Sequence, residues 1–250
     1  FTDTVSFPVG VHTYYLKGKI GTDIDNNVGV AASTTPSTDF AGTVRGSISG
    51  NSVTPTPASA ITMSTMTVKS GSLTISVSSV PIAQTVIAGS KQFLFANYIL
   101  DAGSSGEDAR ISGLPVEFDL PTTSYTDITN CAMFDGASSV SSTVSPSGAA
   151  SSTNFSFSGG GLVVAKGTTK TLGLKCDVGS GAAGTVQMGY NTASNPSISG
   201  VTSGQDITET ENGSEGQRMS LASGGSFTAS LDASSGPYTV VSAGQSNVEL

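Results

Sequence analysis

Charge is scarce in this sequence, and tryptophan is absent. Lys and Arg total 10 and Asp and Glu total 18, so only 11% of the 250 residues are charged, against about 25% in an ordinary soluble domain. Binding to a phosphate backbone needs clustered Lys and Arg, and because no such cluster is present, no nucleic-acid partner is expected. No apolar run of about 18 residues occurs either, so no membrane span is expected in this segment.

What is abundant is Ser, Thr, Asn and Gly, arranged around short apolar alternations. Residues 73–77, 116–120 and 172–176 alternate between apolar and polar side chains, and Gly- or Ser-rich stretches separate such runs. This period of two is typical of strands, and the polar residues disfavour helix interiors. The sequence therefore predicts an all-β protein built from β-sandwich domains, with no significant helix and a thin core.

An internal repeat is the most informative feature. Residues 71–77 match 225–231 at an offset of 154, and residues 15–20 match 171–176 at an offset of 156. Two separate segments at nearly one offset predict a repeat unit of about 155 residues.

The repeat divides the chain into three parts. Residues 1–72 are expected to be the C-terminal part of one β-sandwich repeat. Residues 73–226 form a complete repeat, with a sandwich core over about 73–190 and a Ser/Thr/Gly-rich connecting segment over 191–226. Residues 227–250 open a further repeat. We expect both partial repeats to contact β-structure beyond an isolated domain, through covalent continuation of the chain or through strand addition between neighbouring subunits; the first is favoured.

These strand and turn signatures resemble a module of very large, low-charge secreted surface proteins of small uncultivated bacteria. The residues that carry the resemblance are 71–75, 86–89, 93–100, 106–108, 111–120 and 163–178. The resemblance implies tandem Ig-like domains along an extracellular chain of the S-layer, stalk, filament or adhesin type. It carries no catalytic residue over.

The residues that catalysis needs are few. His12 is the single histidine, and its equivalent in the repeat is Thr168, so an essential general base at His12 is not expected. Two cysteines and one histidine are too few for an ordinary zinc site. We therefore expect no enzymatic activity and no cofactor.

Calcium is the one metal that the sequence leaves open. Asp23, Asp25 and Asn27 begin like a calcium loop, but Val28 and Thr34 stand where an EF-hand needs Gly and Glu. A looser calcium site and a solvated Asx-rich turn remain the alternatives there, and the turn is favoured. Further carboxylates, for which solvated loops are expected, are Glu107, Asp108, Asp206, Glu209, Glu211 and Glu215.

Covalent modification involves the two cysteines and two asparagines. Cys176 lies on the apolar face of its strand, and we predict a disulfide to Cys131, with two buried free thiols as the alternative. Asn154 and Asn212 each begin an Asn-X-Ser triplet for N-glycosylation. Such triplets are frequent in Ser-rich sequence, so unmodified side chains are favoured.

The sequence as a whole predicts an extracellular structural protein at the cell surface. Its expected role is that of a repeat-domain subunit of a layer, sheath or filament, and its expected partners are copies of itself. The alternative is an adhesin or ligand-binding ectodomain, in which the sandwiches serve as a stalk and glycans are candidate partners.

Overall fold

The computed structural model describes residues 4–21, 26–147, 152–194, 196–224, 228–230, 243–244 and 246. Its regular elements are strands, apart from the four-residue helix α1 (Pro36–Asp39) and the 3-10 turn η1 (Tyr125–Asp127). The predicted all-β class, without significant helix, is confirmed.

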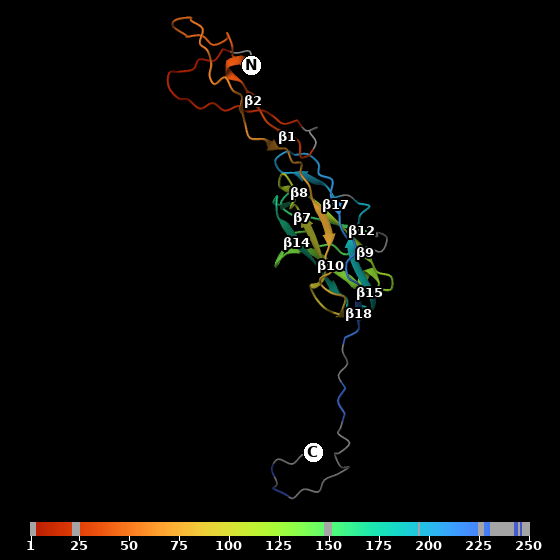
Figure 1. Ribbon diagram of the computed structural model, residues 1–250. Coiled ribbons are helices and arrows are strands. Elements are labelled where there is room, and N and C mark those ends of the chain that lie inside the picture. The colour runs from red at the N-terminus through yellow and green to blue at the C-terminus, as the bar shows by residue number, and fades with distance from the viewer. Residues whose placement is uncertain are drawn as a thin grey trace.

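Two main sheets pack face to face around one core (Figure 1). The larger sheet contains, in spatial order, β11 (Ser138–Ser139), β10 (Ile128–Asp135), β14 (Thr169–Val178), β7 (Phe93–Asp101), β5 (Thr74–Val77) and β17 (Thr210–Glu211). The smaller contains β12 (Ser152–Ser156), β9 (Gly113–Asp119), β15 (Gly184–Tyr190), β18 (Met219–Ala222) and β6 (Thr85–Ile87). A third sheet, at one end, contains β13 (Leu162–Val164), β8 (Ala109–Ile111) and β16 (Ile198–Gly200).

Strand β14 shows how the alternating sequence produces a central strand. Leu172, Leu174 and Cys176 are fully buried, whereas the residues between them are only partly covered. The buried face packs into the core, and β14 pairs on one side with β7 and on the other with β10. A period of two places every second side chain on the core face, which is why this strand was predictable.

The two main sheets are also linked by a buried hydrogen bond. The Tyr98 hydroxyl on β7 donates to the carbonyl oxygen of Gly189 on β15, at 3.0 Å. Complete burial raises the pKa of Tyr98 above its ordinary value, so the phenol stays protonated and remains a donor. A buried hydroxyl without a partner would be costly, and this bond satisfies it.

The sandwich extends beyond the boundary predicted from the sequence. Residues 191–226 were expected to be a connecting segment, but they contain β16, β17 and β18. In this segment Ile198, Ile207, Met219 and Leu221 are buried. The physical reason is long-range pairing: β17 runs parallel to β5 and β18 runs parallel to β6. The core therefore runs from Leu73 to Leu221.

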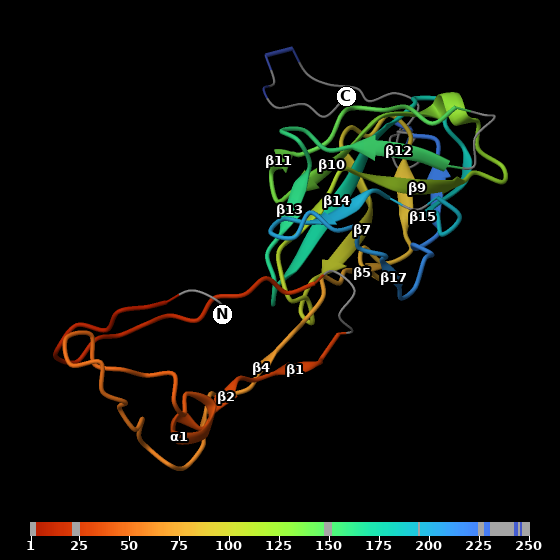
Figure 2. The same cartoon turned by 90° about the horizontal axis from the view of Figure 1, so that it is seen from above.

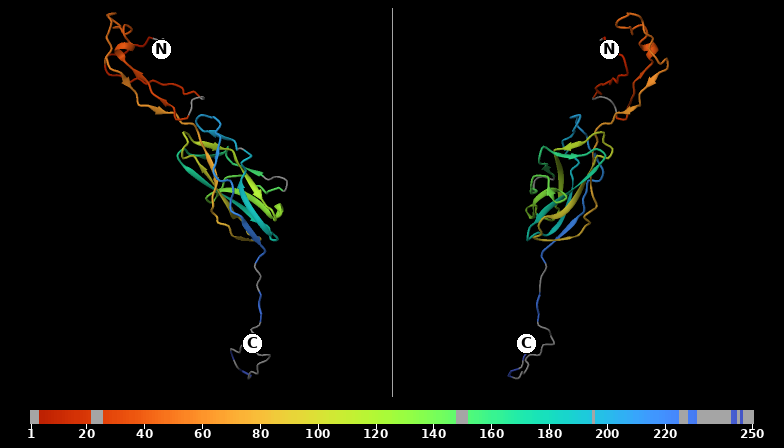
Figure 3. Two further views of the ribbon diagram at one scale, coloured as in Figure 1. Left: turned by 45° about the vertical axis from the view of Figure 1, so that its right-hand side comes forward. Right: turned by 90° about the vertical axis from the view of Figure 1, so that its left-hand side faces the viewer.

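Residues 4–21 and 26–72, called the arm below, lie outside the sandwich. Figure 1 shows the arm extending away from the end of the sandwich where β8 lies, and Figures 2 and 3 show the arm from other sides. Two short antiparallel ladders hold part of it: β1 (Gly29–Val30) with β4 (Met66–Thr67), and β2 (Ser33–Thr34) with β3 (Ile61–Thr62). No helix in the described part of the chain is long and apolar enough to cross a membrane.

Candidate functional site

Three features of the molecule are candidates for function: the linked strands at one end of β14, the junction between arm and sandwich, and the arm itself. In the described residues, every buried side-chain nitrogen or oxygen has a hydrogen-bond partner. No group of three or more His, Cys, Asp or Glu side chains in the same residues is placed to hold a metal ion.

A disulfide joins Cys131 on β10 to Cys176 on β14. The two strands are neighbours in the larger sheet, and both cysteines are fully buried. The bond lies where the β10–β14 register shifts between Thr129 and Ala132. It therefore ties two strands together where their ladder is interrupted.

Asp177, next to Cys176, collects three hydrogen bonds from two separate segments. The Gln92 backbone N–H donates to Oδ1 at 2.9 Å, and the Asn130 side-chain amide and the Lys91 ammonium donate to Oδ2 at 3.0 and 3.3 Å. Gln92 and Asn130 are two of the three non-glycine residues with positive φ in the described residues. Such backbones persist only where their surroundings hold them, and the Asp177 carboxylate holds both.

The same contacts set the titration of this carboxyl group. The hydrogen bond from Asn130 and then that from the Gln92 backbone lower the pKa of Asp177, which outweighs the opposing effect of burial; Lys91 lowers it further. The group is therefore a carboxylate at neutral pH. The cluster is a structural node that joins the start of β7, the bulge in β10 and the end of β14.

We predict that Asp177→Asn lowers the free energy of unfolding by about 1–3 kcal/mol at neutral pH, because a charged acceptor of three donors is lost. Since the folded pKa of Asp177 is depressed, its contribution is present above the unfolded pKa and disappears as the pH falls through the folded pKa. Urea unfolding at neutral and acidic pH measures this. The control is Glu117→Gln, at an exposed position on β9. If Asp177→Asn lowered the free energy of unfolding as much in acid as at neutral pH, the prediction would be contradicted.

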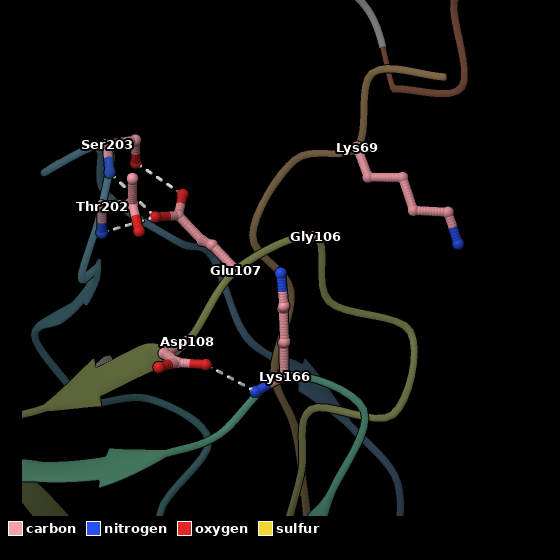
Figure 4. Close-up of a pocket in the computed structure, with 7 residues that line it drawn as sticks. All are labelled: Lys69, Gly106, Glu107, Asp108, Lys166, Thr202 and Ser203. Carbon is pink, nitrogen blue, oxygen red and sulfur yellow. Dashed lines mark hydrogen bonds between the residues drawn. The ribbon is translucent and has the colours of Figure 1, made fainter. Parts of the chain in front are cut away.

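The acidic turn, residues 105–108, connects the arm to the sandwich (Figure 4). Gly106 N–H donates to the carbonyl oxygen of Ser70 at 3.0 Å, and Ser72 N–H donates to the Ser105 hydroxyl at 3.1 Å. A side chain at position 106 would collide with the Lys69 backbone. The glycine is therefore required for this close approach.

Glu107 turns in the other direction, onto the hairpin of residues 198–207. Its Oε2 accepts the backbone N–H groups of Thr202 and Ser203, both at 2.8 Å, and its Oε1 accepts the Ser203 hydroxyl at 2.6 Å (Figure 4). Partial burial opposes ionisation, but these three bonds prevail and lower the pKa of Glu107. Residues 106–108 of this turn line a surface pocket of about 370 Å³ together with Lys69, Lys166, Thr202 and Ser203. Glu107 thus anchors the hairpin beside the arm.

The calcium candidates fall partly outside the described residues. Asp23 and Asp25 lie there, whereas Asn27 occupies a turn in which its backbone N–H donates to the carbonyl oxygen of Val68 at 2.8 Å. The neighbouring Asn26 accepts the Ser70 N–H through its side chain at 3.2 Å. Asn26 and Asn27 thus serve the base of the arm, and the favoured solvated turn over residues 23–27 stays a prediction.

The other residues singled out from the sequence are dispersed. Asn154 is exposed on the edge strand β12, and Asn212 is exposed beside β5, where its N–H donates to Ile75. That both side chains are unmodified stays a prediction. Glu209 accepts the Tyr190 hydroxyl at 3.1 Å, so this carboxylate serves the sandwich. His12 lies in the arm, and its Nε2 is 3.4 Å from the Val9 carbonyl oxygen.

Two apolar side chains of the arm are exposed although their repeat equivalents are buried. Leu16 and Ile20 are 61% and 45% exposed, whereas their equivalents Leu172 and Cys176 in β14 are fully buried. Other exposed apolar residues of the arm are Phe7, Val9, Val11, Tyr14, Tyr15 and Ile48. Exposed apolar surface on this scale marks a site of interaction.

The arm also repeats the local geometry of the sandwich, most fully in the hairpin of residues 44–53. Val53 N–H donates to Val44 at 3.0 Å, as Ile207 N–H donates to Ile198 at 2.9 Å. The two pairs are related by the same offset that relates residues 71–77 to residues 225–231. Sharp turns follow at Gly50 and Gly204, with φ of 68° and 69°.

Further hydrogen bonds of the hairpin 44–53 have counterparts in the hairpin 198–207. Gly46 accepts from Gly50 in the arm, and Gly200 accepts from Gly204 in the sandwich, both at 2.9 Å. The isolated bridges Arg45–Ser52 and Ser199–Asp206 are related by the same offset again. The sequence carries a signal that could have revealed this match, V-x-G-x-x-S-G-x-x-V against I-x-G-x-x-S-G-x-x-I.

Two more contacts recur at nearly the same offset. The β1–β4 ladder pairs Gly29 with Thr67, and their repeat equivalents Gly184 and Leu221 pair in β15–β18. The contact of His12 with Val9 corresponds to that of the Thr168 hydroxyl with Ala165, at the offset that relates residues 15–20 to residues 171–176. None of these contacts defined the repeat, so they are independent observations in its favour.

No protein-family model and no curated protein matches the chain. Among solved structures, the seventh ScaB type I cohesin from Pseudobacteroides cellulosolvens is 10% identical over 64% of this chain and 99% of its own, with a TM-score of 0.36. CaCohA2 from Clostridium acetobutylicum is 12% identical over 61% and 92%, with a TM-score of 0.33. The third ScaB cohesin of R. flavefaciens, in complex with a group 1 dockerin, is 12% identical over 63% and 99%, with a TM-score of 0.29. At these values the chain is similar to cohesins without being assigned to their family.

Proposed function

We propose that this chain is part of an extracellular structural protein, a tandem-sandwich subunit of a cell-surface layer, sheath or filament. The observation that carries the proposal is the recurrence of one hairpin geometry in the arm and in the sandwich, at residues 44–53 and 198–207. A chain that builds the same unit again at a fixed interval has the architecture of an extended repeat polymer.

The sandwich has properties that suit such a role. The disulfide between β10 and β14 fits an oxidising compartment outside the cytosol. The low charge and the Ser/Thr-rich surface fit a protein that stands at the cell surface. The Asp177 node and the Glu107 anchor join separate segments through charged hydrogen bonds. The proposed role is mechanical and requires no catalytic site.

Electron microscopy of the native surface tests the proposal. Antibodies against residues 1–250 should label the cell exterior, and sheared surface material that carries the label should form a lattice or filament with a regular repeat. Labelled but isolated stalks without periodic order would favour the adhesin alternative. Label confined to the cell interior would refute an extracellular role.

A further inference from the structure

We infer that the arm is the C-terminal half of a second β-sandwich, and that a repeat of residues 73–154 covers its open edges and apolar side chains. The inference rests on the repeat architecture of the proposed function and names the partner that completes it. The partner is a half-sandwich with strands equivalent to β5 through β11.

The pairing of the observed sandwich identifies this partner. In the C-terminal half, strand β14 pairs with β7 and β10, strand β15 pairs with β9, and strand β18 pairs with β6. Strands β13 and β16 both pair with β8, and β17 pairs with β5. All of these partners come from residues 73–154.

The one ladder that the C-terminal half forms between its own named strands is β15–β18. The arm forms the equivalent of this ladder as β1–β4. Its hairpin at 44–53, likewise, reproduces one that closes within the C-terminal half. The arm thus has the ladder and the hairpin that the half makes alone. It has one further ladder, β2–β3, without a counterpart among the named strands of the sandwich, and in the described residues it lacks the pairings that need residues 73–154.

The exposed side chains of the arm fit the same partner. In the sandwich, β14 lies between β7 and β10 in the larger sheet, and its core face with Leu172 and Cys176 is buried in the core between the two main sheets. Their equivalents Leu16 and Ile20 are exposed where those two strands would lie. A partner half that supplies equivalents of β7 and β10 beside this strand, and of β9 in the facing sheet, would cover them.

A polar contact makes the inference specific. Glu107 accepts the N–H groups of Thr202 and Ser203 in the hairpin 198–207. At the same places in the hairpin 44–53 stand Ile48 and Ser49. The covering segment should therefore present a carboxylate, at the position of Glu107, to these two N–H groups.

The test is a fusion in which a second copy of residues 73–154 precedes residue 1 of the whole chain. Amide hydrogen exchange at residues 15–20 and at Ile48 and Ser49 should slow at least about tenfold relative to the parent chain, because these amides would enter a cooperative unit. The calorimetric enthalpy of unfolding should rise substantially, since it scales with the number of folded residues.

Matched variants separate this arrangement from unspecific collapse. Leu16→Asp should abolish the new protection, because its equivalent Leu172 is buried, whereas Tyr15→Asp should leave it, because the equivalent Thr171 is exposed. Glu107→Ala in the added copy alone should restore fast amide exchange at Ile48 and Ser49 first.

Two results would overturn the inference. In the first, the arm exchanges as fast in the fusion as in the parent chain. In the second, the amides of the arm are already protected in the parent chain, and this protection depends on protein concentration. That result would mean that a second copy of the chain covers the arm. Neither result bears on surface location, which electron microscopy decides.

Discussion

Reduction of the Cys131–Cys176 disulfide should lower the free energy of unfolding of the sandwich by about 4 kcal/mol. The bond closes a loop of 45 residues, and in the chain-entropy model a loop of this size restricts the unfolded chain by about that amount. For a domain of this size the loss corresponds to a fall in Tm of roughly 10 °C. Both thiols would remain buried, because each side chain lies in the core.

Calorimetry with and without reductant measures the effect, and peptide mass spectrometry establishes the state of the thiols. The double variant Cys131→Ser/Cys176→Ser is the control, because reductant has no bond to break in it and its Tm should not respond. A native chain in which both cysteines are alkylated without prior reduction would contradict the disulfide. A Tm that is unchanged by complete reduction would contradict its stabilising role.

Leu172→Ala should cost about 2–5 kcal/mol, whereas Leu16→Ala should cost less than about 0.5 kcal/mol. Leu172 is fully buried in β14, so its truncation removes apolar contacts and leaves a cavity. Leu16 has the same position in the repeat but is 61% exposed, and substitutions of exposed residues away from special features change stability little.

Urea unfolding of both variants, followed by far-UV circular dichroism, measures the difference. The comparison is matched in residue type and in repeat position, so only burial differs. A large loss for Leu16→Ala in the parent chain would mean that the arm already packs against a partner. In the fusion that carries an added copy of residues 73–154, the same substitution should become destabilising.

Several expectations from the sequence depend on local patterns, and they correspond closely to the structure. The alternation in residues 172–176 indicated a strand with Leu172, Leu174 and Cys176 on its core face, and β14 has that form. The match between residues 71–77 and 225–231 led to the predicted repeat, and its offset of 154 recurs in the contacts of the hairpin 44–53.

Other features could not be predicted, because they depend on residues far apart in the chain. Residues 191–226 look like a polar connection, yet β17 and β18 return to pair with β5 and β6, which lie far earlier in the chain. The cluster at Asp177 joins Gln92 and Asn130 through backbone conformations that no motif indicates. Glu107 was interpreted as a solvated loop residue, and its three bonds to the 198–207 hairpin were missed.

The sequence by itself determined the strand character and the composition of the core, and it predicts the interval at which the unit recurs. These properties follow from the period of side chains along a strand and from comparison of one segment with another, neither of which needs a partner in space. Tertiary structure alone decided which strand lies beside which, where the sandwich ends and which carboxylates hold it together. The physical reason is that these pairings are formed by closing long loops, and their energy lies in contacts between segments that the sequence lists far apart.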